Sequence, residues 1–126
     1  MDQETVTNAC RKDAGKLLKS KYKQIWSPEN PTFGYCYIVS EALFHYAYPK
    51  HKPFVINLGV FGTHWYLDTP QRNDRIDFTA DQFRAFDITR HYEKSKCCGF
   101  FKGSVQTERG YISKAGYAMA QLLGLV

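Results

Sequence analysis

Residues 30–48 read NPTFGYCYIVSEALFHYAY, and this stretch decides how the rest of the chain is interpreted. The opening Asn-Pro indicates a turn, and the apolar residues that follow recur at helical spacing until Pro49. We therefore predict a loop followed by a helix over residues 34–48. Cys36 falls at the junction, where the positive end of the helix dipole favours a thiolate, the nucleophilic form of cysteine.

The composition predicts one folded domain over residues 1–126. Hydrophobic residues make up 44% of the chain and aromatic residues 16%, which is enough for a packed core and unlike a disordered chain. No apolar run reaches the roughly 18 residues that span a bilayer, and the N-terminus does not resemble a secretory signal. We therefore expect no membrane partner and a cytoplasmic location.

The cysteines and histidines do not follow the spacing of a metal site. The chain has four of each, without a CxxC pair, and a reducing compartment would keep the cysteines as free thiols. We predict neither a metal ion nor a cofactor, and a structural role for Cys97 and Cys98. The net charge of +5 lies mainly at the two ends of the chain, so nucleic-acid binding stays a hypothesis without a recognisable motif.

The remaining elements follow from periodicity and from turn residues. Lysine-rich helical periodicity precedes the loop, and β-branched and aromatic residues punctuated by glycine follow the central helix. We predict a helix over residues 5–26, strands over 54–60, 63–69 and 75–78, a helical turn capped by Thr79 over 80–83, an irregular segment over 86–107 and a closing helix over 108–123.

Strand alternation places a histidine and an aspartate on one face of the predicted sheet. Side chains on a strand alternate between its faces, and the apolar Trp65 and Leu67 should face the core. His64 then faces the opposite way. The apolar neighbours of Asp77 place its carboxylate on the same face as His64, within lateral reach if the two strands pair.

Cys36, His64 and Asp77 therefore form a predicted catalytic triad of thiol nucleophile, imidazole base and orienting carboxylate. Each residue alone has a plainer explanation: a small buried cysteine, a structural histidine or a turn aspartate. Asp68 is an alternative orienting group.

Three further side chains lie beside His64 in the predicted strand. Tyr66 and Asp68 share its face and are predicted to contact a substrate. Trp65 is a candidate substrate contact that would shield the site or aid an oxyanion, although strand alternation favours a role in core packing.

Several segments resemble known cysteine enzymes. FGYCYIVSEAL resembles the nucleophile segment of transglutaminase-like and papain-like enzymes, and GTHWYLD with RIDFT is similar to their histidine and aspartate strands. WSPENPTFGYC, GTHWYLD and IDFTADQF together resemble the YunG-like family of small bacterial and phage proteins over residues 26–83. The resemblance implies a papain-like α+β fold: a nucleophile-bearing helix on a small antiparallel sheet, with flanking N- and C-terminal helices. It implies the roles given above for Cys36, His64 and Asp77, but no substrate.

The sequence departs from this family directly before the cysteine. Many relatives carry glutamine where this chain has Tyr35, so a side-chain amide is missing. The backbone N–H of Cys36 can still donate to an oxyanion. The second donor stays open between Asn30, the Tyr35 hydroxyl and another backbone N–H, and we include Asn30 and Tyr35 among the predicted substrate-binding residues.

The predicted activity is acyl transfer through a thioester on Cys36, as amide hydrolysis, deamidation or transamidation. The substrate would be a peptide, a protein or a small amide. The alternative is a non-catalytic binding protein on the same scaffold, for example a phage protein that binds a host factor.

Overall fold

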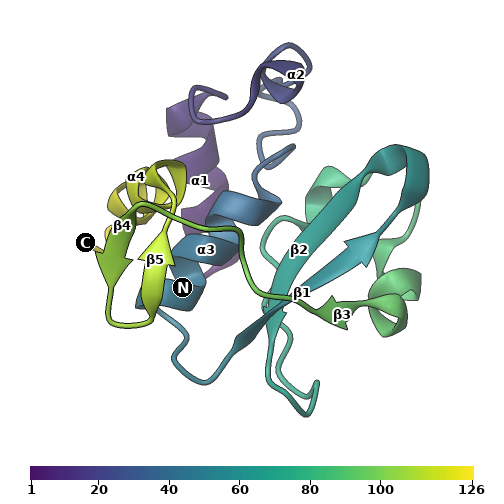
Figure 1. The fold of residues 1–126 in the computed structure, drawn as a ribbon. Helices are drawn as coiled ribbons and strands as arrows, with labels where there is room; N and C mark the ends of the chain where they lie inside the picture. Colours follow the sequence, from purple (N-terminus) through teal and green to yellow (C-terminus); the bar gives the residue numbers. More distant parts are fainter.

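Helix α3 (Cys36–Tyr46) occupies the middle of the molecule. In the computed structural model, which describes residues 1–126, α1 (Gln3–Asp13) and α4 (Lys114–Leu122) lie on one side of α3, and the main sheet lies on the other (Figure 1). The mixed helices and small antiparallel sheets confirm the coarse α+β prediction. The other elements are α2 (Ser20–Lys23), β1 (Lys52–Asn57), β2 (Thr63–Asp68), β3 (Lys96–Cys97), β4 (Val105–Thr107), β5 (Gly110–Ile112) and the 3-10 turns η1 (Gly59–Phe61), η2 (Ala80–Gln82) and η3 (Ile88–Lys94).

The main sheet has the order β2-β1-β3, and its pairs are antiparallel. Strands β1 and β2 form a hairpin around η1, in a register that sets Ile56 opposite His64. Both faces are covered. Leu67 packs in the core shared with α3, while Tyr66 packs in a second cluster with Phe54 and Ile56. Burial on both faces therefore encloses the polar side chains that share a face with Tyr66.

The predicted helix over residues 5–26 is wrong, because α1 ends at Asp13. Ala14 and Gly15 adopt left-handed conformations with φ of 52° and 80°. The Asp13 carboxylate accepts hydrogen bonds from the Leu17 N–H at 2.9 Å and from the Tyr35 hydroxyl at 2.5 Å, which fixes this turn. Only α2 continues as helix before the loop.

The closing helix also begins later than predicted. Residues 105–112 form the β4–β5 hairpin, and α4 starts only after Ser113, whose side chain accepts a hydrogen bond from the Gly116 N–H at 3.0 Å. The buried Glu41 of α3 accepts two further bonds from Ser113, one from its hydroxyl and one from its N–H. The N-terminus of α4 is thereby fixed to α3.

The other boundaries differ in detail. The predicted strand 54–60 spans residues 52–57 and then turns into η1. The predicted strand 75–78 is reduced to a single antiparallel bridge between Leu67 and Ile76. Thr79 precedes η2 without a side-chain cap, and the segment predicted to be irregular contains η3, β3 and β4.

The Tyr35 hydroxyl gives a first testable prediction, because it also accepts a hydrogen bond from the Gly15 N–H at 2.7 Å. Tyr35→Phe leaves the Gly15 N–H and the Asp13 carboxylate without this hydrogen-bond partner. We therefore expect the free energy of unfolding to fall by about 1–3 kcal/mol. Urea unfolding measures this change. Tyr111→Phe is the matched control, since Tyr111 is 55% exposed. Equal losses in the two variants would contradict the role of the Tyr35 hydroxyl.

Candidate active site

Cys36 is the first residue of α3, and its side chain is buried against the start of β2. Its thiol donates to the Thr63 carbonyl, with 3.9 Å between sulfur and oxygen. No side chain caps this end of α3, so the N–H groups of the first turn remain available near the sulfur. A developing negative charge on the sulfur or on an adjacent oxygen would therefore meet the positive end of α3.

His64 and Asp77 are joined by a hydrogen bond inside the protein. The distance between His64 Nε2 and Asp77 Oδ2 is 2.7 Å, and both side chains are almost fully buried. Continuing the Leu67–Ile76 bridge by one residue sets Asp77 opposite Tyr66, on the face that also carries His64. The pairing of His64 with Asp77 expected from strand alternation is therefore present.

Tyr92 of η3 completes the surroundings of the aspartate. Its hydroxyl donates to Asp77 Oδ2 at 2.5 Å, whereas Asp77 Oδ1 is buried without a partner. Burial and the negative charge of Asp77 raise the pKa of Tyr92, so its hydroxyl remains a hydrogen-bond donor. The carboxylate is thus held from two directions, which fixes the imidazole that it contacts.

The other ring nitrogen of His64 is free. Nδ1 is buried without a hydrogen-bond partner, so the thiol and the ring do not form a closed hydrogen bond in this state. Burial alone lowers the pKa of His64, but the interactions with Asp77 and with the Cys36 sulfur outweigh it and raise the pKa to about 9. The imidazole is therefore protonated at pH 7 and places a positive charge beside the thiol.

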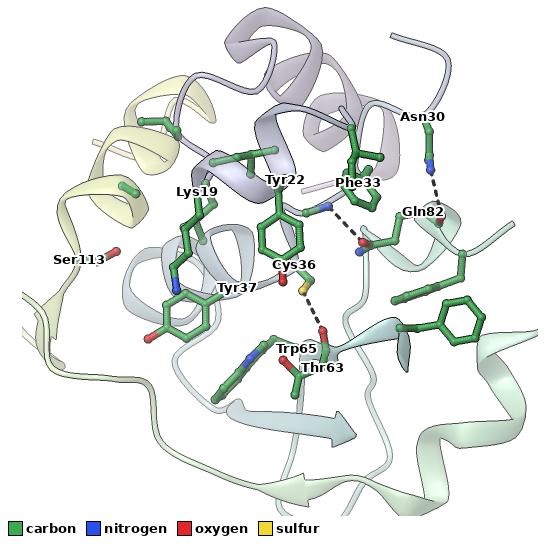
Figure 2. A pocket seen from close by; sticks show the side chains of 18 of the residues that line it. Lys19, Tyr22, Asn30, Phe33, Cys36, Tyr37, Thr63, Trp65, Gln82 and Ser113 are labelled. Atoms are coloured by element: carbon green, nitrogen blue, oxygen red, sulfur yellow. Dashed lines mark hydrogen bonds between the residues drawn. The ribbon is translucent and has the colours of Figure 1, made fainter. Parts of the chain in front are cut away.

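A cavity of about 660 Å³ opens onto Cys36, which lies among the lining residues shown in Figure 2. The volume is within the usual range for ligand-binding cavities. Phe83 lines it and contacts the ring of His64 edge-on, with 4.8 Å between ring centroids. The other lining residues are Leu17, Leu18, Lys19, Tyr22, Ile25, Asn30, Phe33, Gly34, Tyr37, Ile38, Phe61, Thr63, Trp65, Gln82, Arg84, Ala85, Phe86, Phe101, Lys102, Ser113 and Ala115.

Two of the five predicted substrate-binding residues line this cavity, namely Asn30 and Trp65. The Asn30 Nδ2 group donates to the Gln82 carbonyl at 3.0 Å and is engaged within the protein. Tyr35 does not line the cavity, because its hydroxyl points to Asp13 and Gly15 on the other side of α3. The Tyr35 hydroxyl donates its only proton to Asp13, so it offers no free donor to an oxyanion here.

Tyr66 and Asp68 also lie away from the cavity. The Tyr66 hydroxyl is buried and pairs with the Ser95 hydroxyl at 2.6 Å. One carboxylate oxygen of Asp68 accepts from the N–H groups of Thr69 and Asp74, so Asp68 fixes a turn and does not contact His64. Strand alternation placed both residues on the correct face, but that face is filled by other side chains of the protein.

Sequence reasoning missed Tyr92 and Gln82. The Gln82 amide accepts from the Gly34 N–H at 3.2 Å and donates to the Thr79 carbonyl at 3.0 Å, which joins the loop before Cys36 to the segment after Asp77 (Figure 2). No local pattern links either residue to the site, because both contacts bring together distant parts of the chain. The hydrogen bond from Asn30 to the Gln82 carbonyl likewise could not be predicted from local sequence.

No three His, Cys, Asp or Glu side chains gather in an arrangement that would hold a metal ion. None of the helices combines the length and the apolarity needed to cross a bilayer. Compared with protein-family models, curated proteins and solved structures, the chain matches none of them.

Proposed function

We propose that this protein is a thiol-dependent acyl-transfer enzyme in which Cys36 is the nucleophile, His64 the acid–base group and Asp77 the orienting carboxylate. The observation that carries the proposal is the buried hydrogen bond between His64 Nε2 and Asp77. It leaves the other ring nitrogen, Nδ1, without a partner, and the interaction of the ring with the Cys36 sulfur raises the pKa of His64. A cavity that opens onto the sulfur gives a substrate access. The scaffold we propose is papain-like, as in the YunG-like family that residues 26–83 resemble.

The Cys36 thiol first loses its proton to solvent, because His64 already carries one. The resulting thiolate attacks the carbonyl carbon of an amide. A carbon–sulfur bond forms, and the negative charge moves to the carbonyl oxygen. We assign the stabilisation of that oxygen to the backbone N–H of Cys36, because Cys36 is the first residue of α3 and no side chain caps this helix end. A second donor would be another N–H of the first turn of α3 or the indole N–H of Trp65, which lines the same cavity.

The protonated His64 then gives its proton to the amide nitrogen as the carbon–nitrogen bond breaks. The acyl group stays on Cys36 as a thioester. Water or an amine next attacks the thioester while neutral His64 takes its proton, and the carbon–sulfur bond breaks to restore the thiolate. Hydrolysis, deamidation and transamidation share these steps and differ in the amide attacked and in the acceptor.

A second candidate is a binding protein without catalysis on the same scaffold. The observation that favours it is the closed packing around Tyr35, which stands where many YunG-like relatives carry a glutamine amide. In that case the cysteine and histidine would be structural, and removing His64 would leave the reactivity of Cys36 unchanged.

Alkylation of Cys36 by iodoacetamide tests the proposal without a known substrate. The thiolate displaces iodide, and peptide mass spectrometry follows the rate at Cys36 separately from the other cysteines. Because protonated His64 stabilises the thiolate, we expect His64→Ala to slow the reaction at pH 6.5 by about tenfold or more. The difference should shrink towards pH 9, where the imidazolium loses its proton.

His91→Ala is the matched control, since His91 lies in η3 and does not line the cavity. Equal rates in the wild type and in His64→Ala across this pH range would identify a structural cysteine and overturn the proposed enzyme.

A further inference from the structure

The cavity at Cys36 has a positive lining. Lys19, Arg84 and Lys102 contribute to it, and no aspartate or glutamate does. The ion pairs within the protein involve only His51 and His64, so none of these three cations is neutralised by a carboxylate. Arg84 donates to the backbone carbonyls of Asp81 and Glu29, which are neutral acceptors. A bound group that complements this lining is therefore anionic.

Aromatic rings form one wall of the same cavity. Phe86 packs on Phe61 and on Phe83, with ring centroids 4.9 and 5.3 Å apart. Phe83 in turn contacts the ring of His64, so this wall extends from the rim to the proposed acid–base group. A second wall consists of Tyr37 and Phe101, whose rings stack at 5.6 Å. Large apolar side chains fit such walls.

The rim exposes apolar side chains that a small ligand inside the cavity would leave in water. Ile25, Phe61 and Phe101 line the cavity, yet they are 67%, 57% and 73% exposed. Exposed apolar groups clustered around a functional cavity are typical of a surface that binds a protein segment. A free small amide would cover fewer of them.

Cys36 lies between two groups of lining residues. In Figure 2, Lys19, Tyr37 and Ser113 lie to one side of the sulfur, and Asn30 and Gln82 lie to the other. Residues that line the cavity therefore lie on both sides of the nucleophile. A peptide that crosses the site with its attacked amide bond over the sulfur would contact both groups of residues. An acyl chain that ends at the sulfur would contact only one of them.

Resting on the proposed function, we propose that the substrate is an acidic peptide segment that crosses the cavity, places large apolar side chains against the aromatic walls beside Cys36, and sets its carboxylates near Lys19 and Lys102. This assignment names the substrate class of the proposed acyl-transfer site. The selectivity for substrate would then come from the carboxylates and the large apolar side chains of the peptide.

Peptidyl chloromethyl ketones test the assignment on the full-length protein. The Cys36 sulfur forms a bond to the methylene carbon and chloride leaves, so each probe reports how well its peptide occupies the cavity. The probes are acetyl-Glu-Glu-Leu-Phe, acetyl-Lys-Lys-Leu-Phe and acetyl-Glu-Glu-Gly-Ala chloromethyl ketones, together with a chloromethyl ketone that carries a linear decyl chain. Mass spectrometry gives the second-order rate constant at Cys36 for each probe.

We expect the acidic Leu-Phe probe to react about tenfold faster than the basic one at low salt, with the ratio falling as salt screens the charges. The rate constant of the acidic Leu-Phe probe should also exceed that of the acidic Gly-Ala probe by a similar factor. Lys19→Glu combined with Lys102→Glu should bring the acidic-to-basic ratio to about one or below. Lys50→Glu combined with Lys94→Glu, two exposed lysines outside the lining, makes the same change in net charge and should keep the preference.

Equal rates for the acidic and basic probes would overturn the assignment, and so would an equal loss of preference in both lysine pairs. A faster reaction of the decyl probe than of every peptide would overturn it in favour of an acyl-chain ligand. These ratios are measured whether or not Cys36 is activated. Failure of the assignment is therefore distinguishable from failure of the enzyme proposal, which the iodoacetamide rates in His64→Ala decide.

Discussion

Replacing Asp77 with asparagine is expected to remove a large pH dependence from the stability of this protein. In the wild type, the pKa of His64 is about 9 in the folded state against 6.5 as its ordinary value. The folded protein therefore holds a proton on His64 that the unfolded chain releases. The resulting stability is fully present below pH 6.5 and is lost as the pH rises through about 9.

The expected loss between pH 6.5 and 8.5 is on the order of 2–3 kcal/mol in the free energy of unfolding. In Asp77→Asn, burial lowers the pKa of His64 and only the Cys36 sulfur opposes it, so we expect a nearly flat curve. Two other buried groups with shifted pKa values, Cys10 and His45, act outside this window. Burial raises the pKa of Cys10 to about 12, which lowers stability only above about pH 9, and burial lowers the pKa of His45.

Urea unfolding at several pH values measures both curves. Asp74→Asn is the matched control, because Asp74 pairs with His51 at 3.2 Å but its side chain is 61% exposed. Because the Asp74 carboxylate is screened by solvent, this pair contributes little and the control should keep the slope of the wild type. Parallel curves for the wild type and Asp77→Asn would contradict the charged His64–Asp77 pair. The same Asp77→Asn variant should also alkylate more slowly at Cys36 at pH 7.

The pairing of His64 with Asp77 could be predicted from the sequence, because that inference needs only the two-residue period of a strand. The apolar Trp65 and Leu67 settle which face carries His64, and the bridge at Ile76 supplies the pairing. The helix that begins beside Cys36 was likewise predictable, since Pro49 and the preceding loop bound it locally.

The missing parts depend on contacts between distant residues. The break after α1 is fixed by the Tyr35 hydroxyl, which reaches back 20 residues to Gly15. Local periodicity cannot detect such a bond, so the helix predicted from it ran through Gly15. Tyr92 reaches Asp77 by the packing of η3 beneath the sheet, and no pattern in its own segment indicates that contact.

The placement of Tyr66 away from the cavity has a different cause. Strand alternation identifies a shared face, but it cannot tell whether that face is open to a substrate or covered by the protein. Here Tyr66 packs with Ile88 and Tyr92 around η3, so the face is filled. The cavity lies instead around Cys36 and Trp65, on the side of β2 where we had expected only core.

The segment that carries Phe101 and Lys102 should be displaced by Gly103→Ala. An added Cβ at position 103 would lie 2.3 Å from the Ile112 carbonyl carbon and 2.5 Å from its oxygen. Both are backbone atoms of β5 and cannot rotate away. The segment must therefore move, which strains the hydrogen bond from the Ser104 N–H to the Ile112 carbonyl. We expect the free energy of unfolding to fall by about 2–3 kcal/mol.

Gly99→Ala is the matched control, since an added Cβ there would meet no atom within 4 Å. We expect a change below about 0.5 kcal/mol for this variant. Equal unfolding midpoints and slopes for the wild type and Gly103→Ala in urea would contradict the close approach of this segment to β5.

The displacement should also reach the cavity. The Phe101 N–H donates to the Tyr37 hydroxyl at 2.7 Å, and this bond holds Phe101 and the adjacent Lys102 beside the lining. If Gly103→Ala moves the segment, the preference of Cys36 for acidic Leu-Phe probes should weaken. The iodoacetamide rate should be retained, because the hydrogen bonds of the His64–Asp77 pair involve only Tyr92 and no residue of the displaced segment. A loss of both properties together would instead indicate that the substitution disturbs the whole fold, and the urea curve would report that directly.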